Sequence, residues 1–237
     1  MQYAGGKNQA GLYQWIINRM PPHSVYVEAF LGSGAVLRMK RRALVATIAI
    51  DVDDTGWLAF SSEDAGGVRF VHDDAIAFLG GEGLPRETLV YCDPPYLMET
   101  RRGARAIYAN EMTALQHRQL LRCCLGLDCM VMISGYWSEL YDKALQGWRC
   151  DRRRVMTRGG TWAEECLWMN YPAPFALHDY RYLGCDFRER ERIKRRKARW
   201  VARLEKMPEL ERFAVLDAIE VVRYRLAVSG GDGPSRQ

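Results

Sequence analysis

Seven short segments, most of them apolar, are predicted as β-strands, and their spacing constrains the fold more than any other feature of the chain. They cover residues 25–29, 44–50, 68–72, 88–92, 129–134, 148–155 and 165–170. Helical patterns separate the early segments, whereas few separate the late ones. Because alternating β and α elements imply a parallel sheet and a helix-poor end favours an antiparallel edge, we predict an α/β fold. Its sheet would be seven-stranded and mostly parallel, with an antiparallel edge.

The fourth segment stops at two prolines, in the run Tyr91-Cys92-Asp93-Pro94-Pro95-Tyr96. Proline lacks a backbone N–H and keeps the preceding residue extended, so the chain here is stiff and its carbonyls lack internal partners. Asp93 and the Pro94 carbonyl can each accept a hydrogen bond from an NH2 group, and Tyr96 can stack on a ring. Two such acceptors favour alkylation of a ring amine, because they help to restore the nitrogen lone pair. A structural alternative is a strand with a Pro-Pro turn and a surface tyrosine.

Glycine-containing segments and strand-end acids occur earlier in the chain. Residues 3–7 read Tyr-Ala-Gly-Gly-Lys, and the strand at 25–29 leads into a turn with Gly32 and Gly34 before a helix. Such turns bring a nucleotide-like ligand against backbone at a strand's carboxyl end, although each is weak evidence individually. Asp51 ends the second strand, where a ribose would be bound, and Asp74 with the backbone of Ala75 could reach an adenine edge.

In this order, the blocks resemble those of the Dam-like DNA adenine N6-methyltransferases, which use S-adenosylmethionine (SAM). The blocks are Tyr-x-Gly-Gly-Lys, Glu-x-Phe-x-Gly-Ser-Gly, an acid after each of the next two strands, and Asp-Pro-Pro-Tyr. Residues 93–121 and 164–171 look like the compact phage and prophage members, and the resemblance covers nearly the whole chain. It implies a Rossmann-like methyltransferase fold, SAM as methyl donor, S-adenosylhomocysteine as product, and no metal. It also implies a cytoplasmic enzyme that is encoded by a bacterium or phage and is associated with the nucleoid when bound to DNA. Enzymes of this kind occur in restriction-modification systems.

The resemblance further implies roles for individual residues. The target base would be held by the catalytic residues Asp93, Pro94, Pro95 and Tyr96. SAM would be bound by Tyr3, Gly6, Lys7, Glu28, Phe30, Gly32, Gly34, Asp51, Asp74, Ala75 and Asp93. Within this set, Lys7 would pair with the SAM carboxylate. Ala29 stands where the family usually has proline, which leaves the turn before Phe30 less rigid.

One expected segment is missing. Dam itself has a long target-recognition insert between the third and fourth blocks, yet only residues 75–88 separate Asp74 from the catalytic strand. Within this stretch, residues 78–85 have the composition of a tight loop. Sequence readout must therefore come from elsewhere in the chain, from a second copy of it, or from both.

The basic residues are unevenly placed, although the formal net charge of +5 over 237 residues is modest for a nucleic-acid binder. Phosphate contacts with such residues would dominate affinity and make it depend strongly on salt. We expect DNA contacts from Arg101, Arg102, Arg105, Tyr108, Arg188, Arg192, Arg195 and Arg196. The first four lie in residues 97–110, which we expect to form a mobile loop over the base-binding cleft. For the later arginines, a solvated helix face is the alternative.

The C-terminal part predicts a basic helical hairpin, with amphipathic helices at 188–204 and 209–226. It could lie against DNA, or pair with its copy in a homodimer, which is plausible because two basic surfaces suit a two-fold symmetric site. We expect a SAM-binding and catalytic domain over 1–176, a helical appendage for DNA binding or dimerisation over 177–228, and a disordered tail over 229–237.

Other features narrow the class of protein. The seven cysteines include no Cys-x-x-Cys pair and no zinc spacing, and neither a signal peptide nor a transmembrane run is visible. We expect a reduced intracellular enzyme, without a metal or membrane partner, that methylates N6 of an adenine flipped from double-stranded DNA. The alternatives are a methyltransferase acting on cytosine N4, an RNA base or a protein glutamine, and a catalytically silent DNA-binding module.

Overall fold

The computed structural model describes residues 6–8, 11–81, 83–101, 106–156 and 160–229. It divides into two compact units, one over 1–180 and one over 181–237. The sequence predicts this boundary slightly earlier, after residue 176. Each unit is described separately below.

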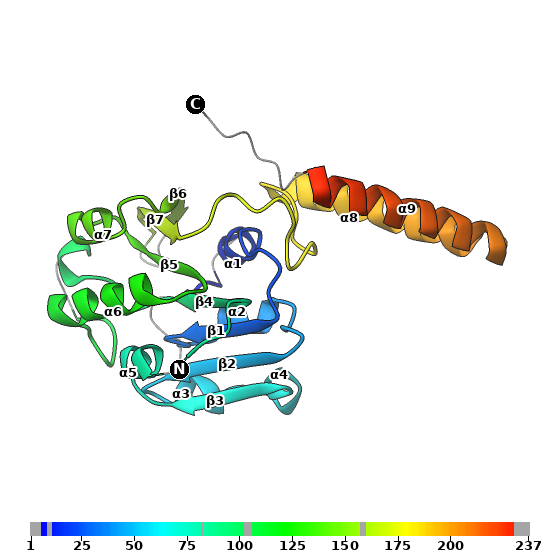
Figure 1. Ribbon diagram of the computed structural model, residues 1–237. Helices are drawn as coiled ribbons and strands as arrows, with labels where there is room; N and C mark the ends of the chain where they lie inside the picture. Colours follow the sequence, from blue (N-terminus) through cyan, green and yellow to red (C-terminus); the bar gives the residue numbers. More distant parts are fainter. Residues whose placement is uncertain (1–5, 9–10, 82, 102–105, 157–159, 230–237) are drawn as a thin grey trace. The chain divides into compact units, whose positions relative to one another are not determined.

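The first unit is built on a seven-stranded sheet with the order β3-β2-β1-β4-β5-β7-β6 (Figure 1). The strands are β1 (Val25–Ala29), β2 (Ala46–Asp51), β3 (Val68–His72), β4 (Thr88–Cys92), β5 (Met130–Tyr136), β6 (Arg149–Met156) and β7 (Trp162–Met169). The first five run parallel, and β7 is antiparallel to both of its neighbours. The predicted α/β class is confirmed, since the sheet is the mostly parallel, Rossmann-like one with an antiparallel edge.

Short helices cover both faces of this sheet. They are α1 (Leu12–Ile17), α2 (Ala35–Met39), α3 (Thr55–Leu58), α4 (Ser62–Ala65), α5 (Ala75–Gly81), α6 (Ala114–Gly126) and α7 (Glu139–Ala144), with a 3₁₀ turn at Met98–Thr100. The main core joins α5, α6 and α7 to one face, through residues such as Phe78, Leu120 and Trp168. Strands β1 and β4 are buried along their whole length, which explains their continuous apolar sequences.

The register of the central strands determines where the polar residues gather. Ala29 at the end of β1 lies opposite Ile50 of β2 and Cys92 of β4. The residues that follow, Asp51 and Asp93, are therefore brought to the same carboxyl edge of the sheet. The backbone N–H of Asp93 also donates to the Ala29 carbonyl at 3.3 Å, which extends the pairing to the first residue of the Pro-Pro segment.

The predicted strand ends are wrong in places. The sequence predicts a strand from residue 44, but Leu44 and Val45 precede β2 and are 84% and 75% exposed. The backbone N–H of Val45 donates to the Ser24 carbonyl outside the strand ladder, so these apolar side chains face solvent before the buried pairing begins. At the other edge, β7 begins at Trp162, three residues before the predicted start, because the β6 ladder extends that far.

The second unit contains helices α8 (Phe187–Glu205) and α9 (Glu209–Ser229), as the sequence predicts. Asp186 caps α8 by accepting the Glu189 backbone N–H at 2.8 Å. No residue of α8 is buried, and large apolar side chains such as Trp200 and Phe213 are each 56% exposed. The tail expected at 229–237 includes Ser229, which ends α9, whereas 230–237 lie outside the described residues. Within the described ranges, no helix combines the length and apolar composition needed to span a membrane.

Candidate active site

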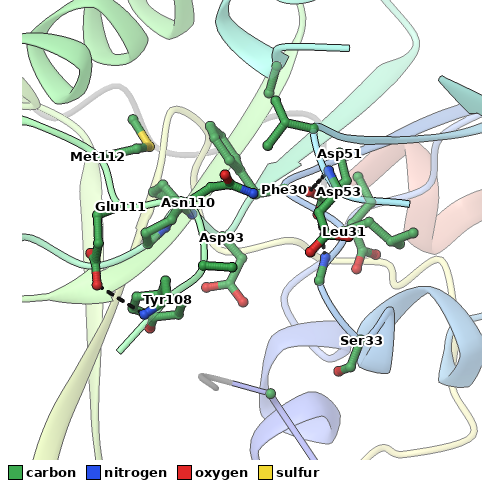
Figure 2. Close-up of a pocket in the computed structure, with 18 of the residues that line it drawn as sticks. Phe30, Leu31, Ser33, Asp51, Asp53, Asp93, Tyr108, Asn110, Glu111 and Met112 are labelled. Atoms are coloured by element: carbon green, nitrogen blue, oxygen red, sulfur yellow. Dashed lines mark hydrogen bonds between the residues drawn. The ribbon is translucent and has the colours of Figure 1, made fainter. Parts of the chain in front are cut away.

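A cavity of about 640 Å³ lies at the carboxyl edge of the sheet. Most of the residues predicted to bind the cofactor or the base line it: Gly6, Lys7, Glu28, Phe30, Gly32, Asp51, Asp74, Ala75, Asp93, Pro94 and Pro95. Tyr108, expected as a DNA contact, also lines it. Figure 2 shows Asp93 between Tyr108 on one side and Phe30 and Asp51 on the other. The carboxyl ends of β1, β2 and β3 therefore border the same cavity as the segment after β4.

The turn after β1 has an unusual backbone. Phe30 has φ 64, although it is not glycine, and Gly32 and Gly34 have φ 50 and 63. A left-handed phenylalanine is strained, and such strain is typical of functional sites. Gly34 does not line the cavity; a Cβ there would lie 2.3 Å from the Phe60 ring. The left-handed backbone at this position favours glycine.

Asp51 and Asp74 are held by backbone amides. The Asp51 carboxylate accepts from the N–H groups of Gly32 at 2.7 Å and Asp53 at 3.0 Å. Burial raises the pKa of Asp51, and these hydrogen bonds oppose the shift. Asp74 caps α5 by accepting from Ile76 at 2.8 Å and Ala77 at 2.9 Å. Both carboxylates keep acceptor capacity for hydroxyl or amine groups of a ligand in the cavity.

Asp93 belongs to a buried, charged network. Lys7 Nζ lies 2.6 Å from Asp93 Oδ1 and 3.2 Å from Glu165 Oε1. The Tyr96 hydroxyl donates to Glu165 and accepts from Lys7, and Ser134 Oγ donates to Asp93 Oδ1 at 2.7 Å. Among the described residues, both side-chain donors to Asp93 therefore use Oδ1, which leaves Oδ2 for a ligand.

Burial and neighbouring charges shift the titration of this network. Burial alone would lower the pKa of Lys7, but the carboxylates of Asp93 and Glu165 outweigh it and raise the pKa above its usual range. Burial raises the pKa of Glu165, and the Lys7 charge opposes this. Burial also raises the pKa of Glu28 on β1 to about 8, against the hydrogen bond from the Tyr26 hydroxyl. Lys7 is thus an ammonium at neutral pH, and Glu28 is largely a neutral acid.

Two predicted roles differ from the observed contacts. The resemblance implies that Lys7 pairs with the SAM carboxylate, whereas in the structure its ammonium contacts Asp93, Glu165 and Tyr96. Tyr96 was assigned to stack on the base, but its side chain does not line the cavity. Lys7 Nζ lies 4.7 Å from the centre of the Tyr96 ring, and Tyr136 packs edge-on at 4.7 Å. Among the residues that the structure describes, Tyr108 is the tyrosine that lines the cavity.

Arg101 also differs from its expected role as a DNA contact. It is only 9% exposed, and it binds the Glu111 carboxylate through two hydrogen bonds of 2.7 and 2.6 Å. It also donates to the Tyr96 carbonyl. Glu111 in turn accepts from the backbone N–H groups of Ile107 at 2.8 Å and Tyr108 at 3.0 Å. This Arg101–Glu111 clamp therefore fixes Tyr108 at the cavity.

The remaining expected DNA contacts are spread over the chain. Arg188, Arg192, Arg195 and Arg196 are all exposed on α8. Arg192 lies 3.1 Å from Glu189, and Arg195 donates to the Glu191 carbonyl. Tyr3, Arg102 and Arg105 lie outside the described residues. The structure therefore brings together the cofactor and base residues of the first unit, while the α8 arginines belong to the second.

Sequence reasoning gave no role to Ser134, Glu111 or Glu165. Glu165 lies in the run 164–171 that supports the family resemblance, and it is the charged residue in the buried half of β7. That position was the signal available, since a charged residue in a buried strand needs a partner. Among the described residues, no group of three or more His, Cys, Asp or Glu side chains is placed to hold a metal ion.

No protein-family model matches the chain, and no curated protein matches it. Similar solved structures include a SAM-dependent methyltransferase from Agrobacterium tumefaciens, with 12% identity, a TM-score of 0.44, and coverage of 67% of this chain and 60% of that one. Another is a 1,6-didemethyltoxoflavin N1-methyltransferase from Burkholderia thailandensis, with 15% identity, a TM-score of 0.46, and coverage of 68% and 77%. These likenesses are weak, and the fold assignment rests on strand order and register instead.

Proposed function

We propose that this chain is a SAM-dependent methyltransferase that modifies N6 of an adenine flipped out of double-stranded DNA. One observation carries the proposal: a single cavity joins the Gly32–Asp51 end of the sheet to Asp93 and Pro94. A methyl donor and an amine acceptor must meet within such a space. The strained turn at Phe30 and the buried charges around Asp93 are both features of functional sites rather than of packing.

The residues at the β1–β2 end fit SAM chemically. Asp51 offers carboxylate oxygens for ribose hydroxyls, and Asp74 with the Ala75 backbone offers hydrogen-bonding groups for an adenine edge. Phe30 supplies an apolar ring beside them. The volume of about 640 Å³ is within the range of small-molecule sites, roughly 300–1,000 Å³.

Asp93 and Pro94 would orient the acceptor amine. When bound, SAM supplies a methyl group on a sulfonium, whose carbon–sulfur bond breaks as the nitrogen lone pair forms the new carbon–nitrogen bond. Asp93 Oδ2 and the Pro94 carbonyl would accept hydrogen bonds from the NH2 group and so hold its lone pair towards the methyl. The methylated nitrogen is positively charged until it loses a proton, which Asp93 Oδ2 can accept and pass to solvent.

Duplex DNA is the partner that this proposal requires. Helix α8 contains nine Arg or Lys residues and three Glu residues, and its arginines at 188, 192, 195 and 196 are exposed. Such a surface suits the phosphate backbone, whose contacts supply most sequence-independent affinity. Because the chain has no long insert to read the target, a homodimer that presents two such helices to a symmetric site is part of the proposal.

The test is methyl transfer from radiolabelled SAM to duplex DNA, RNA and protein, offered separately to the purified protein. The expected result is label in duplex DNA alone. If the label is found only in RNA or only in protein, that molecule is the substrate and DNA is not. If the protein binds DNA but labels no acceptor, it is a catalytically silent DNA-binding module. Labelled DNA should then be digested, because label on cytosine would exclude adenine as the target.

A further inference from the structure

Glu165 is the most buried charged residue of the network around Asp93, and it has no role in the proposed function so far. It lies on β7, opposite Tyr136 of β5, and only 2% of its surface is exposed. Its carboxylate contacts the Lys7 ammonium at 3.2 Å and accepts from the Tyr96 hydroxyl. The antiparallel edge of the sheet thus contributes a charge to a site that the parallel strands otherwise build.

The charges of the network do not cancel. Lys7 supplies one positive charge, whereas Asp93 and Glu165 are two carboxylates that share it. Without Glu165, the ammonium would pair with Asp93 alone at 2.6 Å and neutralise it. With Glu165, one ammonium and two carboxylates leave the group with a net negative charge next to the cavity, while Lys7 still holds Asp93 Oδ1 in place.

We propose that Glu165 is a positioning residue for methyl transfer: by contacting the Lys7 ammonium and accepting from the Tyr96 hydroxyl, it keeps the buried network net negative and helps to hold Asp93 oriented towards the acceptor amine. This inference rests on the proposed function. During transfer, positive charge passes from the sulfonium to the amine nitrogen, so negative charge beside that nitrogen stabilises the transition state more than the bound substrate. Glu165 therefore affects turnover rather than binding.

A purely structural role explains the arrangement less well. Burying an extra carboxylate costs free energy, and apolar side chains of similar volume commonly stabilise a core at least as well as a buried ion pair. Neighbouring positions on β7, such as Leu167 and Trp168, are filled in that way and are almost completely buried. A charge placed instead beside Lys7 and Tyr96, next to the cavity, matches a requirement of the reaction.

The chain offers a matched control one residue away. Glu164 is an acid on the same strand, but its side chain is 47% exposed and lies 3.4 Å from Arg152. Because successive side chains of a strand point to opposite faces, Glu164 is on the other side of the sheet from Glu165. Glu164→Gln and Glu165→Gln thus remove the same charge at adjacent positions, only one of which is in the network.

The test compares steady-state methylation of duplex DNA by the wild type and by these two variants, with thermal melting as a check on folding. Glu165→Gln keeps the shape and a hydrogen-bonding group but loses the charge. We expect its kcat to fall about 10- to 100-fold, with KM for DNA and Kd for SAM within about threefold, while Glu164→Gln matches the wild type. A folded Glu165→Gln with wild-type kcat would overturn the inference. So would an equal loss of kcat in Glu164→Gln.

A second measurement separates this inference from the proposed function. The chain has six lysines, so the side-chain ¹⁵Nζ signals can be assigned and Lys7 observed at neutral pH. Its signal should be protected from exchange in the wild type and in Glu164→Gln, and displaced or lost in Glu165→Gln. If the wild type methylates no acceptor, the proposed function fails, and an unchanged Lys7 signal in Glu165→Gln would overturn this inference independently. If Glu165→Gln does not fold, Glu165→Asp can be measured instead, because it keeps the negative charge but moves the carboxylate away from Lys7. A folded Glu165→Asp variant with undiminished kcat would contradict the inference.

Discussion

The two ends of the cavity hold their carboxylates in opposite ways. At the β1–β2 end, Asp51 and Asp74 accept hydrogen bonds from neutral backbone N–H groups. At the other end, Asp93 and Glu165 share a buried ammonium. Lys7 and Glu165 are only 3% and 2% exposed, so water screens their charges little.

This difference predicts that one end of the cavity determines SAM affinity and the other determines the rate of methyl transfer. Carboxylates that are fixed by backbone amides present hydrogen-bond acceptors in a set geometry, which is what the binding of ribose and adenine needs. Carboxylates around a buried ammonium create a local field, which is what a reaction that moves positive charge needs. Variants at the first end should therefore change affinity for SAM, and variants at the second should change the rate of the chemical step.

The largest effect is expected for Asp93→Ala. It removes both the acceptor for the target amine and the carboxylate that holds Lys7, which then pairs with Glu165 alone. We expect kcat on duplex DNA to fall by about 10³-fold or more, as for the loss of a group that acts in the transition state. Calorimetry should show SAM affinity within about fivefold of wild type. Near-native turnover in this variant would remove Asp93 from catalysis.

The opposite pattern is expected for Asp51→Ala. Hydrogen bonds to charged groups contribute about 1.5–3 kcal/mol, so Kd for SAM should rise roughly 10- to 100-fold. At saturating SAM, kcat should remain within a few fold of wild type. Asp128→Ala is a suitable control, because its side chain is 76% exposed and precedes β5 at the opposite edge of the sheet. A loss in kcat with unchanged SAM affinity would contradict the prediction that the Asp51 end of the cavity determines SAM affinity.

The Arg101–Glu111 clamp lies on the side of Asp93 away from Phe30 and Asp51 (Figure 2). Glu111→Gln would weaken the bidentate pair and loosen the backbone at Ile107 and Tyr108. Since Tyr108 lines the cavity, we expect kcat/KM for DNA to fall about tenfold with Kd for SAM unchanged. Steady-state kinetics with varied DNA would show this. Unaltered kinetics in Glu111→Gln would mean that the clamp does not support the substrate site.

The smallest effect concerns the stability of the fold at Glu28. Its folded pKa of about 8 exceeds the unfolded value of about 4.3, so the folded state holds the proton more tightly. Its contribution to stability is fully present below the unfolded pKa and is lost as the pH rises to about 8. Urea unfolding should show that Glu28→Gln loses less stability than wild type between pH 5 and pH 8.5, by roughly 1 kcal/mol or more. If the wild type and Glu28→Gln lose the same free energy of unfolding over this range, Glu28 is ionised in the folded protein and the prediction is wrong.

Much of the fold and half of the site follow from local sequence. Strands β1 and β4 are read correctly because burial on both faces leaves continuous apolar runs. The acids after them gather at one edge, because parallel strands have aligned carboxyl ends. Thr113 and Gln116 form a capping box at the start of α6, a signal that depends only on residues within one turn.

The missed features depend on partners far away in the sequence. Lys7 and Glu165 are separated by nearly the whole first unit, so no local pattern reveals that they meet. The Tyr96 ring is covered by Lys7 and Tyr136 for the same reason. Arg101 was expected to be an exposed cation, but Glu111 supplies a carboxylate that allows its burial. Charge and side-chain type predict a surface role by default, and only the fold shows which charges are paired.

The most direct test of the account is to identify the product. Duplex DNA incubated with SAM and the purified protein is digested to nucleosides, which are separated and identified by mass spectrometry, with Asp93→Ala as the parallel control. The account predicts N6-methyldeoxyadenosine with the wild type and none with Asp93→Ala. N4-methyldeoxycytidine, or no methylated nucleoside from a wild-type protein that binds both SAM and DNA, would contradict it.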